Sequence, residues 1–115
     1  MRLIALAAAF ALTASLAQAA PQNFTWDGYG TAGGSKCPTY ALHLELTADS
    51  GRVVGWWQQK GREVRKFDLP MAGDGKFGGV VKIGSEDMNV AGMIGANSEI
   101  KLHGYCDFGG PLKKS

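Results

Sequence analysis

The segment 40–69 constrains the fold more than any other part of the chain, because apolar and polar residues alternate along it. His43, Glu45 and Thr47 are polar, and every second residue around them is apolar: Tyr40, Leu42, Leu44 and Leu46. A period of two places these sets on opposite faces of a β-strand, whereas a helix requires spacings of three and four. Turn residues follow at 49–51 and 60–61. We therefore expect three consecutive antiparallel strands.

The first turn predicts how the first two of these strands pair. A three-residue loop at 49–51, with glycine in third place, pairs Ala48 with Arg52. With this register Trp56 faces inward. A two-residue loop would turn Trp57 inward instead, because a slip of one residue exchanges the two faces of a strand. We expect Trp56 inside.

The second turn, Lys60-Gly61, pairs Gln59 with Arg62 as a two-residue hairpin. Together the two turns place one apolar set on a shared inner face: Leu42, Leu44, Leu46, Val54, Trp56 and Phe67. This face becomes polar toward the second turn, where we expect a ligand-binding rim formed by Tyr40, Trp56, Gln58, Glu63 and Arg65. On the outer face we expect an interaction patch formed by His43, Trp57 and Val64.

Residues 1–19 have the pattern of a bacterial signal peptide. A short basic start is followed by an alanine- and leucine-rich apolar run, and small residues precede the expected cleavage between Ala19 and Ala20. The run is short for a membrane span, so we expect none after the signal is removed. The sequence thus predicts a periplasmic or secreted protein.

Residues 20–115 have the length of one domain with one modest core. The 12 basic residues include Arg2 of the leader, which leaves a near balance against the 10 acidic residues. Such a balance lacks the basic surface that nucleic-acid binding requires. We expect a monomer whose partner is an unidentified small ligand or an envelope protein.

The two cysteines, Cys37 and Cys106, are most simply explained by one disulfide in an oxidising compartment. In an up-and-down meander of seven strands both cysteines fall at the same rim, since one lies in the first connection and the other ends the seventh strand. The expected fold is therefore all-β, with seven to eight short antiparallel strands in a closed or nearly closed barrel. A two-sheet β-sandwich is the alternative.

Motifs for catalysis or cofactors are weak in this sequence. The run 28–33 matches G-x-G-x-x-G, but residues 34–38, Gly-Ser-Lys-Cys-Pro, cannot open the helix that a dinucleotide site needs. The histidines, His43 and His103, are expected outward on separate strands, and no zinc spacing is present. Glu63 beside Arg65 is more simply an ion pair than an acid–base site. We expect no cofactor, no metal and no enzymatic activity.

Two segments share a turn pattern of the type Asp-x-Gly-x-x-x-Gly: residues 49–55 and, more loosely, 74–79. In this repeated strand–turn pattern and its single expected disulfide, the chain resembles a group of small exported bacterial β-proteins. Its expected shape is also similar to avidin-like and bacterial inhibitor barrels. The resemblance implies the fold and export but supplies no functional residue.

Three functions follow, in order of preference. The first is a non-enzymatic binding module of the bacterial envelope that uses the rim near Tyr40 and Trp56. The second is a protein–protein interaction or inhibitor role through the patch around Trp57. The third, least favoured, is an enzyme with a non-standard site.

Overall fold

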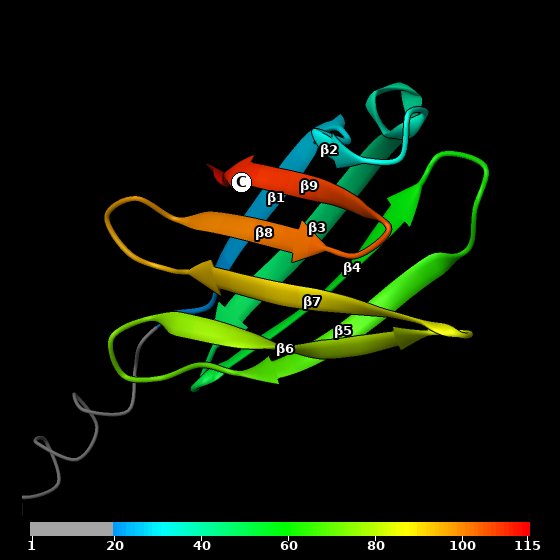
Figure 1. Cartoon of the computed structure of the whole chain (residues 1–115). Coiled ribbons are helices and arrows are strands. Elements are labelled where there is room, and N and C mark those ends of the chain that lie inside the picture. The colour runs from blue at the N-terminus through cyan, green and yellow to red at the C-terminus, as the bar shows by residue number, and fades with distance from the viewer. Residues whose placement is uncertain (1–19) are drawn as a thin grey trace, which may run out of the picture.

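The structure is a computed structural model that describes residues 20–115, and these residues form two antiparallel β-sheets (Figure 1). Sheet A has the order β10-β1-β3-β4-β5, with bounds Lys113–Lys114, Gln22–Tyr29, Ala41–Asp49, Arg52–Gln59 and Val64–Pro70. Sheet B has the order β2-β9-β8-β7-β6, with bounds Ala32–Gly33, Cys106–Pro111, Glu99–His103, Glu86–Met93 and Lys76–Ile83. A single 3-10 turn, Cys37–Thr39, precedes β3. The all-β prediction is confirmed.

The sheets do not close into a barrel, so the expected barrel is wrong and the sandwich alternative is confirmed. Within residues 20–115, one isolated bridge between Met71 and Phe77 joins the β5 end of sheet A to β6. Farther along β6, the Leu69 side chain lies over Gly79, where a Cβ would come within 2.6 Å of Leu69 Cδ2. Beyond this bridge the two edge strands β5 and β6 are not paired. Figure 1 shows the strands of sheet B running across those of sheet A.

At the other edge the chain passes between the sheets three times. It leaves sheet A after β1 to form β2 at the edge of sheet B, returns to sheet A at β3, and leaves sheet B after β9 to form β10 beside β1. The segment 22–33 is therefore divided between the two sheets. Hydrogen bonds secure the first and the last of these crossings, from Thr31 N to Asp107 O at 2.8 Å and from Leu112 N to Ser98 O at 2.9 Å.

The first turn of sheet A is shorter than expected. Ser50 and Gly51 form a two-residue turn with left-handed φ angles of 51° and 78°, so Asp49 pairs with Arg52. The strand β4 is consequently shifted by one residue relative to the predicted register, and its faces are exchanged. The expectation that Trp56 faces inward is wrong.

The second connection, residues 60–63, is longer than the expected two-residue turn, and Gln58 pairs with Val64. The two shifts cancel between β3 and β5, so Arg65 and Phe67 keep the inward orientation that the sequence predicted. Only β4 is turned over, and it brings Trp57 inside, with 3% of its surface exposed. The Trp57 ring centroid lies 5.8 Å from that of Phe67.

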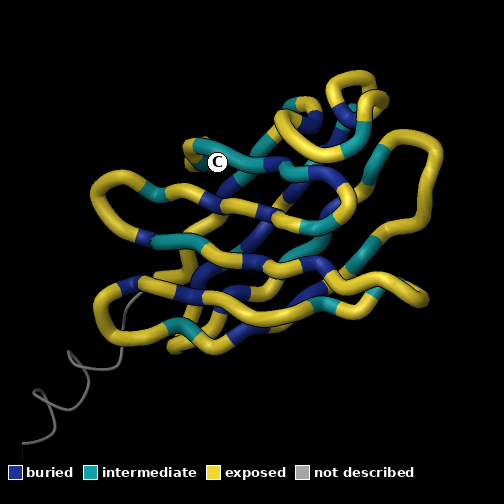
Figure 2. Tube along the Cα trace, in the orientation of Figure 1, coloured by how far each residue is buried: buried dark blue, intermediate teal, exposed yellow. Residues whose placement is uncertain are grey.

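The buried residues of the described chain form one apolar core between the sheets (Figure 2). None of these buried residues is polar or charged. Sheet A contributes chiefly Leu42, Leu44, Leu46, Val53, Trp57 and Phe67, and sheet B chiefly Phe77, Val90, Ile100, Leu102 and Phe108. Such burial contributes roughly 1.5–3 kcal/mol for each large side chain.

Each sheet has a glycine paired with a phenylalanine of its edge strand, β5 in sheet A and β6 in sheet B. Gly55 is the cross-strand partner of Phe67, and Gly92 is the partner of Phe77. A Cβ at Gly55 would lie 2.8 Å from Phe67 Cζ, and one at Gly92 would lie 2.7 Å from Phe77 Cε1. The absence of a side chain at each glycine lets the neighbouring ring lie flat across the strand, which a pleated sheet otherwise prevents.

The predicted disulfide between Cys37 and Cys106 is present, with the Cα atoms 5.6 Å apart. Both cysteines are buried. The bond ties the 3-10 turn before β3 to the start of β9, and so joins the two sheets at one end of the sandwich. Among residues 20–115 there is no helix with the length and apolar character needed to cross a membrane.

Candidate functional site

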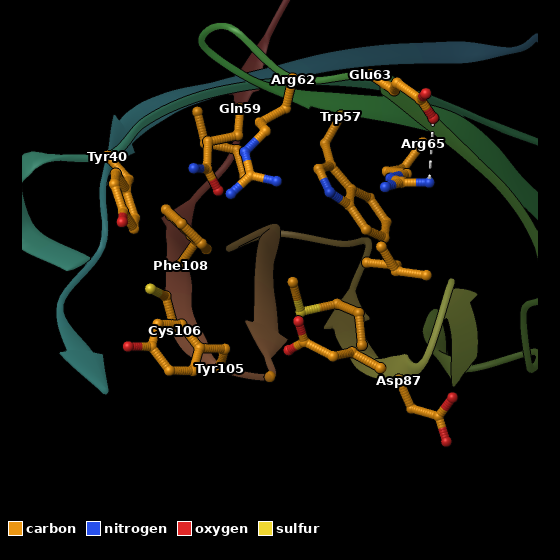
Figure 3. Close-up of a pocket in the computed structure, with 15 residues that line it drawn as sticks. Tyr40, Trp57, Gln59, Arg62, Glu63, Arg65, Asp87, Tyr105, Cys106 and Phe108 are labelled. Atoms are coloured by element: carbon orange, nitrogen blue, oxygen red, sulfur yellow. Dashed lines mark ion pairs between the residues drawn. The ribbon is translucent and has the colours of Figure 1, made fainter. Parts of the chain in front are cut away.

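A cavity of about 160 Å³ opens between the sheets at the end that the disulfide closes (Figure 3). One wall comes from β3, β4, β5 and the connection between the last two. The opposite wall comes from the β6–β7 and β8–β9 hairpins. Cys106 of the disulfide is part of this second wall. The cavity therefore lies where the two sheets separate.

The floor of the cavity is apolar, and its mouth is polar. The floor is formed by the buried side chains Leu42, Trp57, Met88 and Phe108. The mouth carries exposed polar and charged residues, namely Arg62, Glu63, Glu86, Asp87 and Tyr105. Three half-buried residues lie between the mouth and the floor: Tyr40, Gln59 and Arg65. An apolar body with a few convergent polar groups is the usual composition of a small-molecule site.

Most charges at the mouth have a partner of opposite sign. Arg65 Nη1 lies 3.6 Å from Glu63 Oε2, and Lys82 Nζ lies 3.4 Å from Asp87 Oδ1. Figure 3 shows the Arg65–Glu63 pair at one side of the cavity, and Asp87 pointing away from it. Within the described chain no carboxylate lies within ion-pair distance of Arg62, whose guanidinium points into the cavity beside Trp57 (Figure 3).

Two hydrogen bonds fix the position of the Arg62 backbone. Gln58 Nε2 donates to the Arg62 carbonyl oxygen at 2.9 Å, and the Arg62 N–H donates to the Gln59 carbonyl oxygen at 2.8 Å. These bonds attach the connection between β4 and β5 to the last residues of β4.

The structure brings together three of the five residues predicted for the rim. Tyr40, Glu63 and Arg65 line the cavity. Trp56 and Gln58 lie on the opposite face of β4, because that strand is shifted by one residue, and Trp57 and Gln59 take their places.

The sequence prediction missed Arg62 and the entire second wall. The expected two-residue turn pairs Arg62 with Gln59, and this register turns the Arg62 side chain away from the inner face. The second wall includes Ile83, Glu86, Met88 and Phe108, which are more than 20 residues from Trp57 and Gln59 in the chain. No local pattern indicates that these residues meet β4, since only the packing of one sheet on the other brings them there.

The outer face of sheet A carries a second cluster. His43 and Val64 lie on this face as predicted, and Trp56 occupies the place expected for Trp57. The His43 and Trp56 ring centroids are 5.3 Å apart. Val64 is 45% exposed. We name His43, Trp56 and Val64 the outer patch.

His43 is held between two carboxylates. Its Nε2 lies 2.8 Å from Glu45 Oε2, and its Nδ1 lies 2.6 Å from Asp27 Oδ1. The hydrogen bonds to Glu45 and then to Asp27 raise the pKa of His43 above its ordinary value of 6.5, because they favour the charged imidazolium. His103 lies on sheet B, where its Nδ1 is 2.6 Å from Asp107 Oδ1. Residues 20–115 contain no group of three or more side chains placed to bind a metal ion.

Comparison with known proteins gives no match, either to a protein-family model, to a curated protein or to a solved structure. The predicted signal peptide, which ends at Ala19, lies outside the described residues. Function must therefore be inferred from the geometry of the cavity and of the outer patch.

Proposed function

We propose that this chain is a non-enzymatic binding module of the bacterial envelope that holds a small ligand in the cavity between its two sheets. The observation that carries the proposal is the cavity itself: an apolar floor around Trp57 that opens through a polar mouth. The residues proposed for binding are Tyr40, Trp57, Gln59, Glu63 and Arg65. The module acts as a monomer, without cofactor or nucleic acid.

Filling the cavity tests this proposal. Ile83 lines the cavity, whereas Val80 lies on the other face of the same strand and is 53% exposed. A screen of single-ring compounds, followed by tryptophan fluorescence and thermal shift, should find ligands whose binding Ile83→Phe weakens at least tenfold and Val80→Phe leaves unchanged. If no compound binds, or if Ile83→Phe binds as the wild type does, the cavity is not the site.

Export to the periplasm or the medium is part of the same proposal. It is supported by the disulfide, whose two cysteines are buried and joined in the folded chain. When the full chain is expressed in a bacterium, the product should appear in the periplasmic fraction or medium and begin at Ala20. An uncleaved product in the cytoplasm contradicts this assignment.

We also propose kinship with the small exported β-proteins that repeat Asp-x-Gly-x-x-x-Gly. Both glycines of the first repeat have a structural reason to be glycine. Gly51 has a left-handed φ of 78°, and Gly55 makes room for Phe67. In the second repeat Gly75 has a φ of 95°, and Gly79 lies under Leu69. The repeat therefore encodes a turn followed by a contact in the core.

A second candidate function is protein binding or inhibition through the outer patch. It is favoured by the half-exposed Trp56 ring beside His43, since aromatic residues contribute most to protein interfaces. Proteins that co-purify with the wild type from the envelope should be lost with Trp56→Ser. An unchanged set of co-purified proteins counts against the patch.

A further inference from the structure

We infer that the ligand of the cavity is a small organic anion, with an apolar body of one ring or one short branched chain and a single carboxylate that binds Arg62. This inference rests on the proposed function, because it assigns a chemical class to the ligand of the same site.

The size of the cavity limits the apolar body. An apolar cavity of about 150 Å³ in another protein holds one benzene molecule. The cavity here has a volume of about 160 Å³. It is thus large enough for one ring or a branched chain of similar size, and smaller than the roughly 300–1,000 Å³ of most drug-sized sites.

The walls favour an apolar and flat body. Trp57 and Phe108 are aromatic and almost completely buried, at 3% and 4% exposure. Leu42 and Met88 complete the buried lining. Aromatic rings bind best against other rings in offset or edge-to-face arrangements, and methionine adapts to irregular shapes. A strongly polar ligand gains little from this floor.

Arg62 supplies the charge selectivity. It is the lining cation that has no carboxylate within ion-pair distance among residues 20–115, and its guanidinium points into the cavity (Figure 3). A guanidinium matches a carboxylate with two parallel hydrogen bonds, which are stronger than bonds between neutral groups. The neighbouring Gln59 amide and Tyr40 hydroxyl also line the cavity and can donate to the same anion.

The acidic residues of the mouth weaken this preference less than their number suggests. Glu63 is paired with Arg65, and Asp87 is paired with Lys82 and points away. Glu86 is the remaining lining carboxylate, and it is exposed on the opposite wall. Repulsion by Glu86 therefore opposes the anion, and removing its charge should strengthen binding.

Three probes of similar size and different charge test the inference: phenylacetate, 2-phenylethanol and phenethylamine. Titration of the wild type at pH 7 and low salt, followed by tryptophan fluorescence, should show that phenylacetate binds at least fivefold more tightly than the alcohol. The amine should bind most weakly. Raising the salt concentration should reduce the difference between phenylacetate and the alcohol, because ions screen exposed charges.

Variants assign the preference to Arg62. Arg62→Gln should bring phenylacetate to the affinity of the alcohol and leave the alcohol unchanged, whereas Arg62→Lys should retain part of the preference. Lys60→Gln is the matched control: it removes the same charge from the same connection, but Lys60 does not line this cavity. Glu86→Gln should tighten phenylacetate binding. Arg62, Lys60 and Glu86 are all exposed, so these variants should fold.

The outcomes separate this inference from the proposal on which it depends. If the alcohol or the amine binds as tightly as phenylacetate, or if Lys60→Gln and Arg62→Gln act alike, the anion class is wrong and the cavity remains a binding site. If none of the three probes binds, the inference is also overturned. The proposed function fails separately, when the screen of single-ring compounds finds no ligand that Ile83→Phe affects.

Discussion

Trp56 and Trp57 are adjacent in sequence but have different environments, and their substitutions should differ accordingly. Trp57 is buried against Phe67, whereas Trp56 is half-exposed beside His43. Trp57→Ala should lower the free energy of unfolding by about 3–5 kcal/mol, because it leaves a large cavity in the core. Trp56→Ala should cost less than about 1 kcal/mol. Urea denaturation monitored by circular dichroism measures both, and the reverse order would contradict the observed register.

His43 gives a second test at the level of single residues. Its hydrogen bonds to Glu45 and Asp27 raise its pKa above 6.5. Because the folded pKa is raised, the stabilisation is complete below about pH 6.5 and is lost as the pH rises through the folded pKa. NMR titration of the imidazole should give a pKa above 6.5, and Glu45→Gln with Asp27→Asn should lower it. A wild-type pKa at or below that of the double variant would rule out this cluster in solution.

At the level of elements, the glycines under the phenylalanine rings set how closely the strands pack. Gly55→Ala places a methyl group against Phe67 and the Glu45 carbonyl oxygen. It should lower the free energy of unfolding by about 1–3 kcal/mol, as overpacking in cores does. Gly73→Ala is the control, since no atom lies within 4 Å of the added Cβ. Thermal or urea unfolding that shows equal effects at the two positions would contradict this arrangement.

The inward face of a strand could be predicted from sequence where large apolar residues occupy only one of its two faces. In β3 leucines occupy one face only, and its orientation was predicted correctly. In β4 both faces carry large apolar residues, since Val53 and Trp57 point inward and Val54 and Trp56 outward. Its register therefore depended on the first turn alone. That turn places Ser50 at a φ of 51°, an angle that residues other than glycine seldom adopt.

The disulfide was predictable because only two cysteines are present, but the cavity beside it was predictable only in part. One wall belongs to the strands with clear alternation, and Tyr40, Glu63 and Arg65 were identified there. The other wall depends on how sheet B lies across sheet A. No sequence pattern indicates that β5 and β6 share only one isolated bridge and so leave the sheets open at this edge.

For the whole molecule, the disulfide is a covalent cross-link between the two sheets in addition to the backbone connections. It closes a loop with a sequence separation of 69 residues. The double variant Cys37→Ser with Cys106→Ser should lower the free energy of unfolding by about 2–4 kcal/mol, since a loop of this length has much entropy to lose. Reduction of the wild type should have the same effect. Unchanged stability in urea denaturation would show that packing alone holds the sheets together.

The central claim is that ligands bind between the sheets and not on the outer face. The indole N–H groups of Trp57 and Trp56 report on these two places separately, because one lies in the cavity and the other in the outer patch. The most direct measurement is a ¹H–¹⁵N NMR titration of the wild type with phenylacetate and with the best ligand of the single-ring screen. The Trp57 indole signal should shift with a saturable dependence on ligand concentration while the Trp56 signal stays in place. A shift at Trp56 alone, or at neither indole, would contradict binding between the sheets.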